Sequence, residues 1–210
     1  MSGILIYTKL IYKQLSNPEL YATKKDSMLK HLKLIENETK RCGDIVKGLL
    51  EFSRKDQADF EEKHLHEILQ ETYELMTHPI KIANISFLTD FSAKSDLIFC
   101  SPNQIKQACV AIIVNASEAV LENGEIIIKT SNPDDDTIKL EITDNGLGIA
   151  PEDIPHIFEP FFTSKQDESG IGLGLAIVHG IIQSHKGKIE VKSELGNGTT
   201  ISINFTLIRN

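Results

Sequence analysis

The sequence of 210 residues lacks any apolar run of about 18 residues, the least that a membrane-spanning helix requires. No contact with a membrane is therefore expected from this chain. The opening residues lack the positive charge that begins a secretory signal peptide, and Lys9 and Lys13 soon interrupt the apolar stretch. A cleaved export signal is therefore not expected, and a cytoplasmic location is favoured.

Cysteines are few and positive charge is in deficit. Cys42, Cys100 and Cys109 are an odd number without C-x-x-C spacing, which favours reduced, buried thiols in a cytosolic protein.

The chain has 22 Lys and Arg against 30 Asp and Glu, a net charge of −8. This balance argues against a nucleic-acid partner held through its phosphates. A nucleotide would have to be bound by local positive potential against the overall field.

Residues 1–56 have the spacing of a helical hairpin. Residues 4–15 predict a short amphipathic helix, residues 16–19 a turn, and residues 19–54 a longer helix. The apolar positions of the longer helix alternate spacings of four and three, as in a heptad seam: Met28, Leu32, Ile35, Thr39, Cys42, Val46 and Leu49. The short helix cannot bury this stripe alone, so a dimeric four-helix bundle is expected. The alternative is that the stripe packs only on the chain's own C-terminal domain.

The polar stretch over residues 55–59 indicates a linker, which we place at residues 57–62, before a domain over residues 63–210. In this domain we expect three helices and five strands, at residues 65–76, 101–122 and 175–184 and at residues 85–91, 125–130, 138–143, 189–193 and 200–206. Ser101 and Pro102 suit the start of the second helix, and residues 196–198 suit a hairpin turn. Adjacent strand pairs favour an α+β fold, a two-layer sandwich of one mixed sheet under three helices.

Two clusters in this domain suit a metal ion and a base. Asn115 lies on the long helix, and its amide oxygen suits Mg²⁺ that phosphates and water mainly hold. Asp144 follows a strand and can accept a hydrogen bond from an exocyclic amine, which adenine has and guanine lacks at that position. Gly146 and Gly148 let the backbone approach a ligand. Each cluster alone is a weak signal, because surface Asn residues and Asp-Asn-Gly turns are common.

Two further clusters suit a lid and a phosphate. Phe158, Phe161 and Phe162 precede a polar stretch, which favours an apolar hinge for a mobile loop. A core aromatic cluster is the other interpretation and is compatible with a hinge. Lys165 offers a point charge for phosphate. Residues 170–175 are glycine-rich and run into a helix, whose free N–H groups and positive dipole end attract an anion. This is not the dinucleotide fingerprint, because the segment follows a loop rather than the first strand of a βαβ unit.

In order, spacing and context, the four clusters resemble the N, G1, F and G2 boxes of the sensor histidine kinase catalytic domain. That domain belongs to the GHKL superfamily, with DNA gyrase and MutL. The resemblance implies that ATP and Mg²⁺ bind, with Asn115 on Mg²⁺, Asp144 on the adenine amine and a mobile lid over residues 163–169. The other residues implied to contact the nucleotide are Gly146, Gly148, Ile149, Lys165, Gly170, Gly172, Leu173, Gly174, Leu175 and Thr199.

The N-terminal region carries part of the same resemblance and one departure from it. Residues 38–54 are similar to the second helix of the family's dimerisation and phosphoacceptor hairpin. These kinases phosphorylate a histidine in a motif that opens His-Glu or His-Asp and ends Asn-Pro-Leu, which the sequence lacks. Residues 2–10 resemble what usually follows that motif, so the simplest inference is a truncated product that begins just after the acceptor. None of the seven histidines fits the acceptor pattern, and His31 is expected to face solvent, so no catalytic residue is assigned.

A second departure concerns hydrolysis. The ATP-hydrolysing members of the superfamily place a Glu one helical turn before the Asn, where it activates water. That position is Ala111 here, and alanine cannot act as a base. Transfer to a protein nucleophile is therefore favoured over rapid hydrolysis.

The sequence is best interpreted as the ATP-binding catalytic core of a two-component sensor histidine kinase. It would transfer the γ-phosphoryl group to a histidine absent from this chain, for relay to a response regulator. The expected partners are a second copy, through the hairpin, and the regulator's receiver domain; the complete protein could still be membrane-anchored. The alternatives are a nucleotide-gated dimeric scaffold without phosphotransfer, and a GHKL ATPase or serine kinase.

Overall fold

The computed structural model describes residues 3–16, 24–36, 59–121, 124–163 and 172–209. These residues belong to two compact units, one before residue 37 and the other from residue 59 onward. Within the described residues no helix has both the length and the apolar character that crossing a membrane demands. The seam positions from Thr39 to Leu49, and Cys42 among them, lie outside the described residues.

The N-terminal unit contains α1 (Gly3–Leu15) and a second helix over residues 25–36. Ile11 and Met28 are the buried apolar side chains of this hairpin, at 8% and 5% exposure. The described part of the second helix covers residues 25–36, and its predicted start near residue 19 lies outside the described residues.

His31 was predicted to face solvent, but its side chain is half-buried. Its ring stacks on Tyr7 with 5.5 Å between centroids, and its Nδ1 atom is buried without a hydrogen-bond partner among the described residues. Stacking on an aromatic ring buries the body of the imidazole, so this histidine is part of the hairpin's packing.

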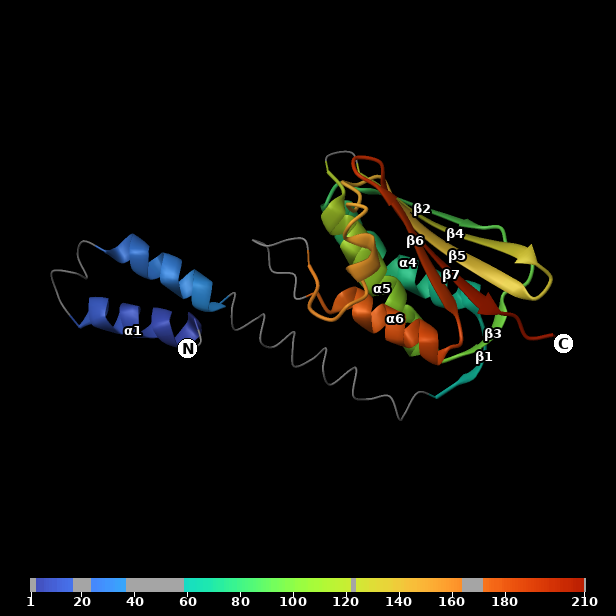
Figure 1. The fold of residues 1–210 in the computed structure, drawn as a ribbon, viewed down its shortest axis with the longest axis horizontal. Coiled ribbons are helices and arrows are strands. Elements are labelled where there is room, and N and C mark those ends of the chain that lie inside the picture. The colour runs from blue at the N-terminus through green and yellow to red at the C-terminus, as the bar shows by residue number, and fades with distance from the viewer. Residues whose placement is uncertain (1–2, 17–23, 37–58, 122–123, 164–171, 210) are drawn as a thin grey trace. The chain divides into compact units, whose positions relative to one another are not determined.

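The described residues of the larger unit form two sheets, three α-helices and one short 3₁₀ helix (Figure 1). Its elements are β1 (Glu61–His64), α4 (Leu65–Ile82), β2 (Ser86–Phe91), β3 (Leu97–Cys100), α5 (Pro102–Ala119), β4 (Glu125–Asp134), β5 (Thr137–Asp144), η1 (Ile154–His156), α6 (Gly174–Ser184), β6 (Lys188–Glu194) and β7 (Gly198–Thr206). Strand β1 begins inside the range predicted as a linker.

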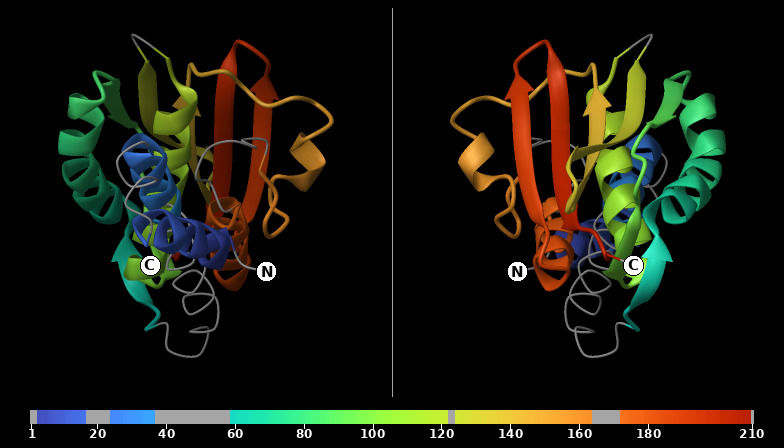
Figure 2. Two further views of the ribbon diagram at one scale, coloured as in Figure 1. Left: turned by 90° about the vertical axis from the view of Figure 1, so that its left-hand side faces the viewer. Right: turned by 90° about the vertical axis from the view of Figure 1, so that its right-hand side faces the viewer.

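The main sheet has five strands in the order β2-β4-β5-β7-β6. Strands β2 and β4 are parallel and the other neighbours are antiparallel, so the sheet is mixed. Helices α4, α5 and α6 cover one face of it, as Figures 1 and 2 show. Strands β1 and β3 form a separate antiparallel pair. The predicted α+β sandwich of one mixed sheet under three helices is therefore confirmed.

Alternation along the strands explains which face the helices cover. Ile126 and Ile128 of β4 and Ile138, Leu140 and Ile142 of β5 are at most 2% exposed. They share one side of the sheet because successive side chains on a strand point to opposite faces. The helices contribute apolar stripes at helical spacing, which on α5 consist of Ile105, Ala108, Cys109, Ile112, Ile113 and Ala116.

The buried cysteines belong to this core. Cys100 and Cys109 are free and buried, as predicted. Burial raises the pKa of the Cys100 thiol to about 11 and that of Cys109 to about 12. Both therefore remain protonated at neutral pH, because a thiolate would lose its hydration inside the core.

His185, at the end of α6, is hydrogen-bonded to Ser101, the residue directly before α5. Its Nε2 accepts a hydrogen bond from the Ser101 N–H at 2.9 Å, and its Nδ1 donates to the Ile181 carbonyl at 2.7 Å. This pattern requires the neutral ring, with the proton on Nδ1. Ser101 occupies the predicted N-cap position, but its side chain makes no capping hydrogen bond. The Phe60 ring covers the imidazole at 4.6 Å between centroids.

The pH dependence of stability follows from this arrangement. Burial lowers the pKa of His185 below its usual 6.5. Above pH 6.5 the His185 ring is mainly neutral in both the folded and the unfolded chain. Below it the unfolded chain binds a proton that the folded chain resists, so the free energy of unfolding falls as the pH falls.

We therefore expect the unfolding temperature of the larger unit to fall between pH 7.5 and 5.5, and His185→Gln to flatten this fall. The measurement is thermal unfolding of the full chain and of the variant at both pH values. His64 acts in the opposite sense, since its hydrogen bond to Asp96 raises its pKa. His64→Gln should therefore steepen the fall, and identical slopes for all three proteins would contradict the assignment.

Candidate functional site

A row of polar side chains interrupts the apolar, helix-facing side of the sheet at one end. Asp144 of β5 pairs with Thr199 of β7, which in turn pairs with Ser193 of β6. Asp144 and Thr199 are 7% and 8% exposed. Because paired residues on neighbouring strands point to the same face, these three side chains lie side by side beneath the helices. The structure thus places two of the predicted site residues, Asp144 and Thr199, in direct register.

The Asp144 carboxylate is buried without a cationic partner in the described residues. Its Oδ1 accepts a hydrogen bond from the Gly146 N–H at 2.9 Å. Burial raises the pKa of this carboxyl, while hydrogen bonds from the backbone N–H groups of Gly146 and Thr199 act in the opposite direction. A buried carboxylate with spare acceptor capacity suits a ligand that brings a donor group.

The loop after β5 is fixed on both sides. The Leu147 N–H donates to the Ala119 carbonyl at 3.0 Å, which joins the loop to the end of α5. The Leu147 carbonyl accepts from the Gly196 N–H at 2.8 Å, in the turn between β6 and β7. The Ile149 N–H donates to the Ser193 hydroxyl at 2.8 Å. Figure 2 shows this segment crossing the end of the sheet before it reaches η1.

Gly148 requires the conformational freedom that only glycine has. Its φ is +70°, in the left-handed region, and a Cβ atom there would overlap the Glu194 carbonyl. The close approach that the structure shows at this position is to another strand of the protein, and the predicted approach to a ligand stays a prediction.

Asn115 lies beside the N-terminus of α6. A Cβ atom built on Gly174 would be 3.7 Å from the Asn115 Nδ2 and 4.0 Å from its Oδ1. Helix α6 begins at Gly174, and the side chain of its N-cap residue, Leu173, makes no capping hydrogen bond. The N-cap side chain thus leaves the positive end of this helix uncapped where Asn115 approaches it, which favours an anion. Leu175 lies in the first turn.

The phenylalanines expected at a hinge are not a buried core cluster. Phe161 is 57% exposed and has φ of +70°, and its N–H donates to the Gly172 carbonyl at 2.9 Å. This hydrogen bond joins the chain before residue 164 to the chain after residue 171; residues 164–171 themselves lie outside the described residues. Phe158 stacks on His179 of α6 at 5.1 Å. The hinge stays a prediction, because Lys165, Gly170 and most of the predicted lid lie outside the described residues.

Ala111 packs against the core one turn before Asn115 on α5. No general base thus stands at the position where the hydrolysing proteins carry one. Three further histidines of this unit have local partners: His64 and His66 contact Asp96, and His156 contacts Glu159.

Ser193 and the Ala119 carbonyl are parts of the site that sequence reasoning missed. Ser193 stands in an ordinary alternating strand, and a backbone carbonyl has no sequence signal. The only available hint was the position of Ser193 just before the predicted turn.

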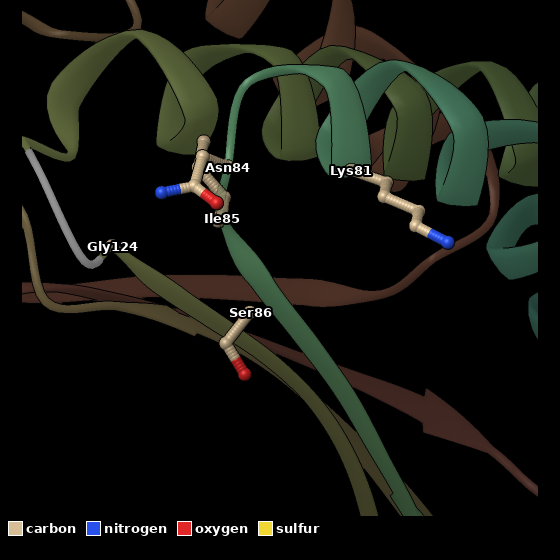
Figure 3. A pocket seen from close by; sticks show the side chains of 5 residues that line it. All are labelled: Lys81, Asn84, Ile85, Ser86 and Gly124. Atoms are coloured by element: carbon tan, nitrogen blue, oxygen red, sulfur yellow. The ribbon is translucent and has the colours of Figure 1, made fainter.

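A shallow depression of about 390 Å³ lies elsewhere, where α4 ends and β2 and β4 begin. It is lined by Lys81, Asn84, Ile85, Ser86 and Gly124. Figure 3 shows the polar ends of the Lys81 and Asn84 side chains pointing away from each other. Because its polar groups do not converge, we assign it no ligand.

Comparison with known proteins identifies the class. Residues 100–209, just over half of the chain, match the family described as histidine kinase-, DNA gyrase B-, and HSP90-like ATPase. The chain belongs to this family, and its larger unit is a histidine kinase ATPase domain, as the four sequence clusters predicted.

Particular relatives are sensor kinases. The chain is 32% identical to sporulation kinase E of Bacillus subtilis over 86% of its length and 24% of that protein's. It is 31% identical to the signal transduction histidine-protein kinase AtoS of Escherichia coli over 99% of its length and 32% of that protein's. The chain thus spans between a quarter and a third of these curated relatives.

Solved structures support the same placement. The catalytic domain of histidine kinase ThkA is 29% identical, with a TM-score of 0.62 over 71% of this chain and 96% of that one. ThkA in complex with response regulator protein TrrA is 29% identical, with a TM-score of 0.74 over 99% of this chain and 58% of that one.

The close packing at Gly148 can be tested by substitution. Gly148→Ala should lower the free energy of unfolding by about 2–5 kcal/mol, the sum of left-handed strain and overlap with Glu194. Gly196→Ala is the matched control, because Gly196 has φ of +80° but nothing within 4 Å of a Cβ. It should cost only the strain, about 1–2 kcal/mol. Denaturant unfolding measures both, and equal losses would contradict the contact.

Proposed function

We propose that this chain is the ATP-binding catalytic core of a two-component sensor histidine kinase. In this proposal it transfers the γ-phosphoryl group of ATP to a histidine that the chain does not itself supply, for relay to a response regulator. The observation that carries the proposal is the pairing of a base end, Asp144 with Thr199, and a phosphate end, Asn115 with the start of α6. Helix α5 joins the two ends, since it bears Asn115 and its last residue, Ala119, holds the loop after Asp144.

At the base end, the Asp144 carboxylate would accept a hydrogen bond from the adenine amine. Its raised pKa reflects a charge that has lost water and has only backbone donors in the described structure. An amine donor would complete its hydrogen bonding. Gly146, Gly148 and Ile149 would form the adjoining wall, and Thr199 the neighbouring polar group.

At the phosphate end, Gly172, Leu173, Gly174 and Leu175 would present backbone N–H groups, with Lys165 and Gly170 completing the phosphate site. Asn115 would be the protein's oxygen ligand to Mg²⁺, which suits an ion held mainly by phosphates and water. Magnesium, when bound, would neutralise charge on the phosphates. The chain's own contribution is positioning, the main requirement of phosphoryl transfer.

In the transfer, the bond between the γ-phosphorus and the bridging oxygen of ATP breaks, and a phosphorus–nitrogen bond to the imidazole forms. ADP leaves. Ala111 supports this outcome over hydrolysis, because an alanine packed on the core cannot activate water.

The proposed partners are a second copy of the chain and a response regulator receiver domain, in the cytoplasm. Exposed apolar residues on the described hairpin support the dimer: Ile6, Leu10, Tyr12, Leu15, Leu29 and Leu32 are each at least 40% exposed. A second hairpin would bury them in a four-helix bundle. The structure of ThkA with TrrA supports the regulator.

Asp144→Asn tests the base end. We expect about a tenfold to hundredfold weaker ATP binding, the loss of one hydrogen bond to a charged group. Without nucleotide the variant should be at least as stable at pH 7, because a raised pKa means that ionisation of Asp144 costs stability as the pH rises. Calorimetry and thermal unfolding measure the two effects. Asp90→Asn, at an exposed strand position, should change neither; a destabilised Asp144→Asn would contradict the account.

Phosphotransfer is tested by supplying the missing acceptor. A separate helical hairpin with the family's histidine motif should become labelled when incubated with this chain and γ-labelled ATP. Asn115→Ala should reduce the rate at least about 100-fold, because metal and phosphate positioning supply most of the catalysis. Asn103→Ala is the matched control, an exposed asparagine in the first turn of the same helix.

ATP binding without labelling of the hairpin would contradict the kinase proposal and favour a nucleotide-gated scaffold. Steady phosphate release without labelling would favour an ATPase.

A further inference from the structure

We propose that Ser193 is a positioning residue that sets the hydrogen-bond polarity of the base site. It does so by fixing the Thr199 hydroxyl and the loop after Asp144. The inference rests on the proposed function, since it concerns how the same site selects its purine.

The hydrogen bonds around Ser193 fix the direction of each donor. Its hydroxyl donates to the Gly198 carbonyl at 2.9 Å. The Ser193 oxygen accepts from the Ile149 N–H at 2.8 Å and lies 2.9 Å from the Thr199 Oγ1. A serine hydroxyl has one proton, and the Gly198 carbonyl takes it. The proton between Ser193 and Thr199 must therefore come from Thr199.

This direction decides what Thr199 can offer a ligand. A threonine hydroxyl also has one proton, and Ser193 accepts it, so the Thr199 oxygen has only lone pairs left. Beside it on the same face lies Asp144, whose ionised carboxylate also only accepts. The end of the sheet therefore presents acceptors in a row. An exocyclic amine, as in adenine, satisfies such a row, whereas a carbonyl at the same ring position would face it unpaired.

Ser193 also supports the other wall of the site. Ser193 accepts a hydrogen bond from the Ile149 N–H. Ile149 belongs to the same loop as Gly148, which packs against the Glu194 carbonyl. Removing the Ser193 hydroxyl would leave this partly buried N–H without its partner and loosen the loop. Ser193 thus acts on two sides of the base site, although it lies outside the sequence motifs that predicted this site.

Substitution of Ser193 tests the proposal through nucleotide selectivity. The probes are ATP and inosine triphosphate, which has a carbonyl where adenine has its amine. In Ser193→Ala the Thr199 hydroxyl is free to turn and donate. We expect ATP affinity to fall about tenfold, equivalent to about 1.4 kcal/mol, and inosine triphosphate affinity to fall less or rise. The preference for ATP should therefore shrink.

Three further variants of the full chain, measured by calorimetry, separate this role from a merely structural one. Ser193→Thr keeps the hydroxyl and should retain the preference for ATP. Thr199→Val lacks the hydroxyl that Ser193 orients and should lose the preference even where Ser193→Ala folds poorly. Ser131→Ala, at the opposite end of the sheet, should leave both affinities unchanged.

An unchanged ATP preference in both Ser193→Ala and Thr199→Val would overturn the inference while leaving ATP binding intact. Equal losses for the two nucleotides would overturn it as well, because they would indicate a structural effect alone. Failure of the unmodified chain to bind ATP would instead overturn the proposed function.

Discussion

Burial of one carboxylate at the end of an apolar sheet face is the constraint on which the site depends. Asp144 is 7% exposed and lies in register with Thr199, beside strands whose other inward residues are isoleucine, leucine and phenylalanine. A charge in such surroundings must find donors, because it has lost most of its water. The Gly146 N–H supplies one, at 2.9 Å from the Asp144 Oδ1. This need accounts for the tight turn after β5.

Other elements of the unit hold the turn after β5 in place. The end of α5, the turn between β6 and β7, and the Ser193 hydroxyl each bond one residue of the loop. Helices α5 and α6 run antiparallel, since His185 at the end of α6 bonds Ser101 before α5, while Gly174 lies near Asn115 at the other ends. The proposed base and phosphate ends of the site are thereby fixed to the same pair of helices.

Most elements were predictable because their residues carry strong local periodicity. The alternation of isoleucines in β4 and β5 and the stripe on α5 gave the correct type and order. Boundaries were less predictable: α4 was expected to end near Met76 but continues through Pro79 to Ile82. A proline in a helix costs stability locally, and here Ile80 is buried in the core beyond it, so packing favours continuation. The prediction that His31 faces solvent was wrong for a similar reason, since a single-chain pattern does not reveal packing partners.

The sequence by itself determined the family, the α+β order of elements and the four clusters proposed to form the site, because glycine, proline, charge and apolar periodicity act over a few residues. Only the tertiary structure decided which side chains meet. Ser193 lies 49 residues after Asp144 in the sequence, yet strand pairing places it two strands away in one row. His185 reaches Ser101 across 84 residues in the same way. Hydrogen bonds between such distant positions depend on register and helix packing, which no local pattern encodes.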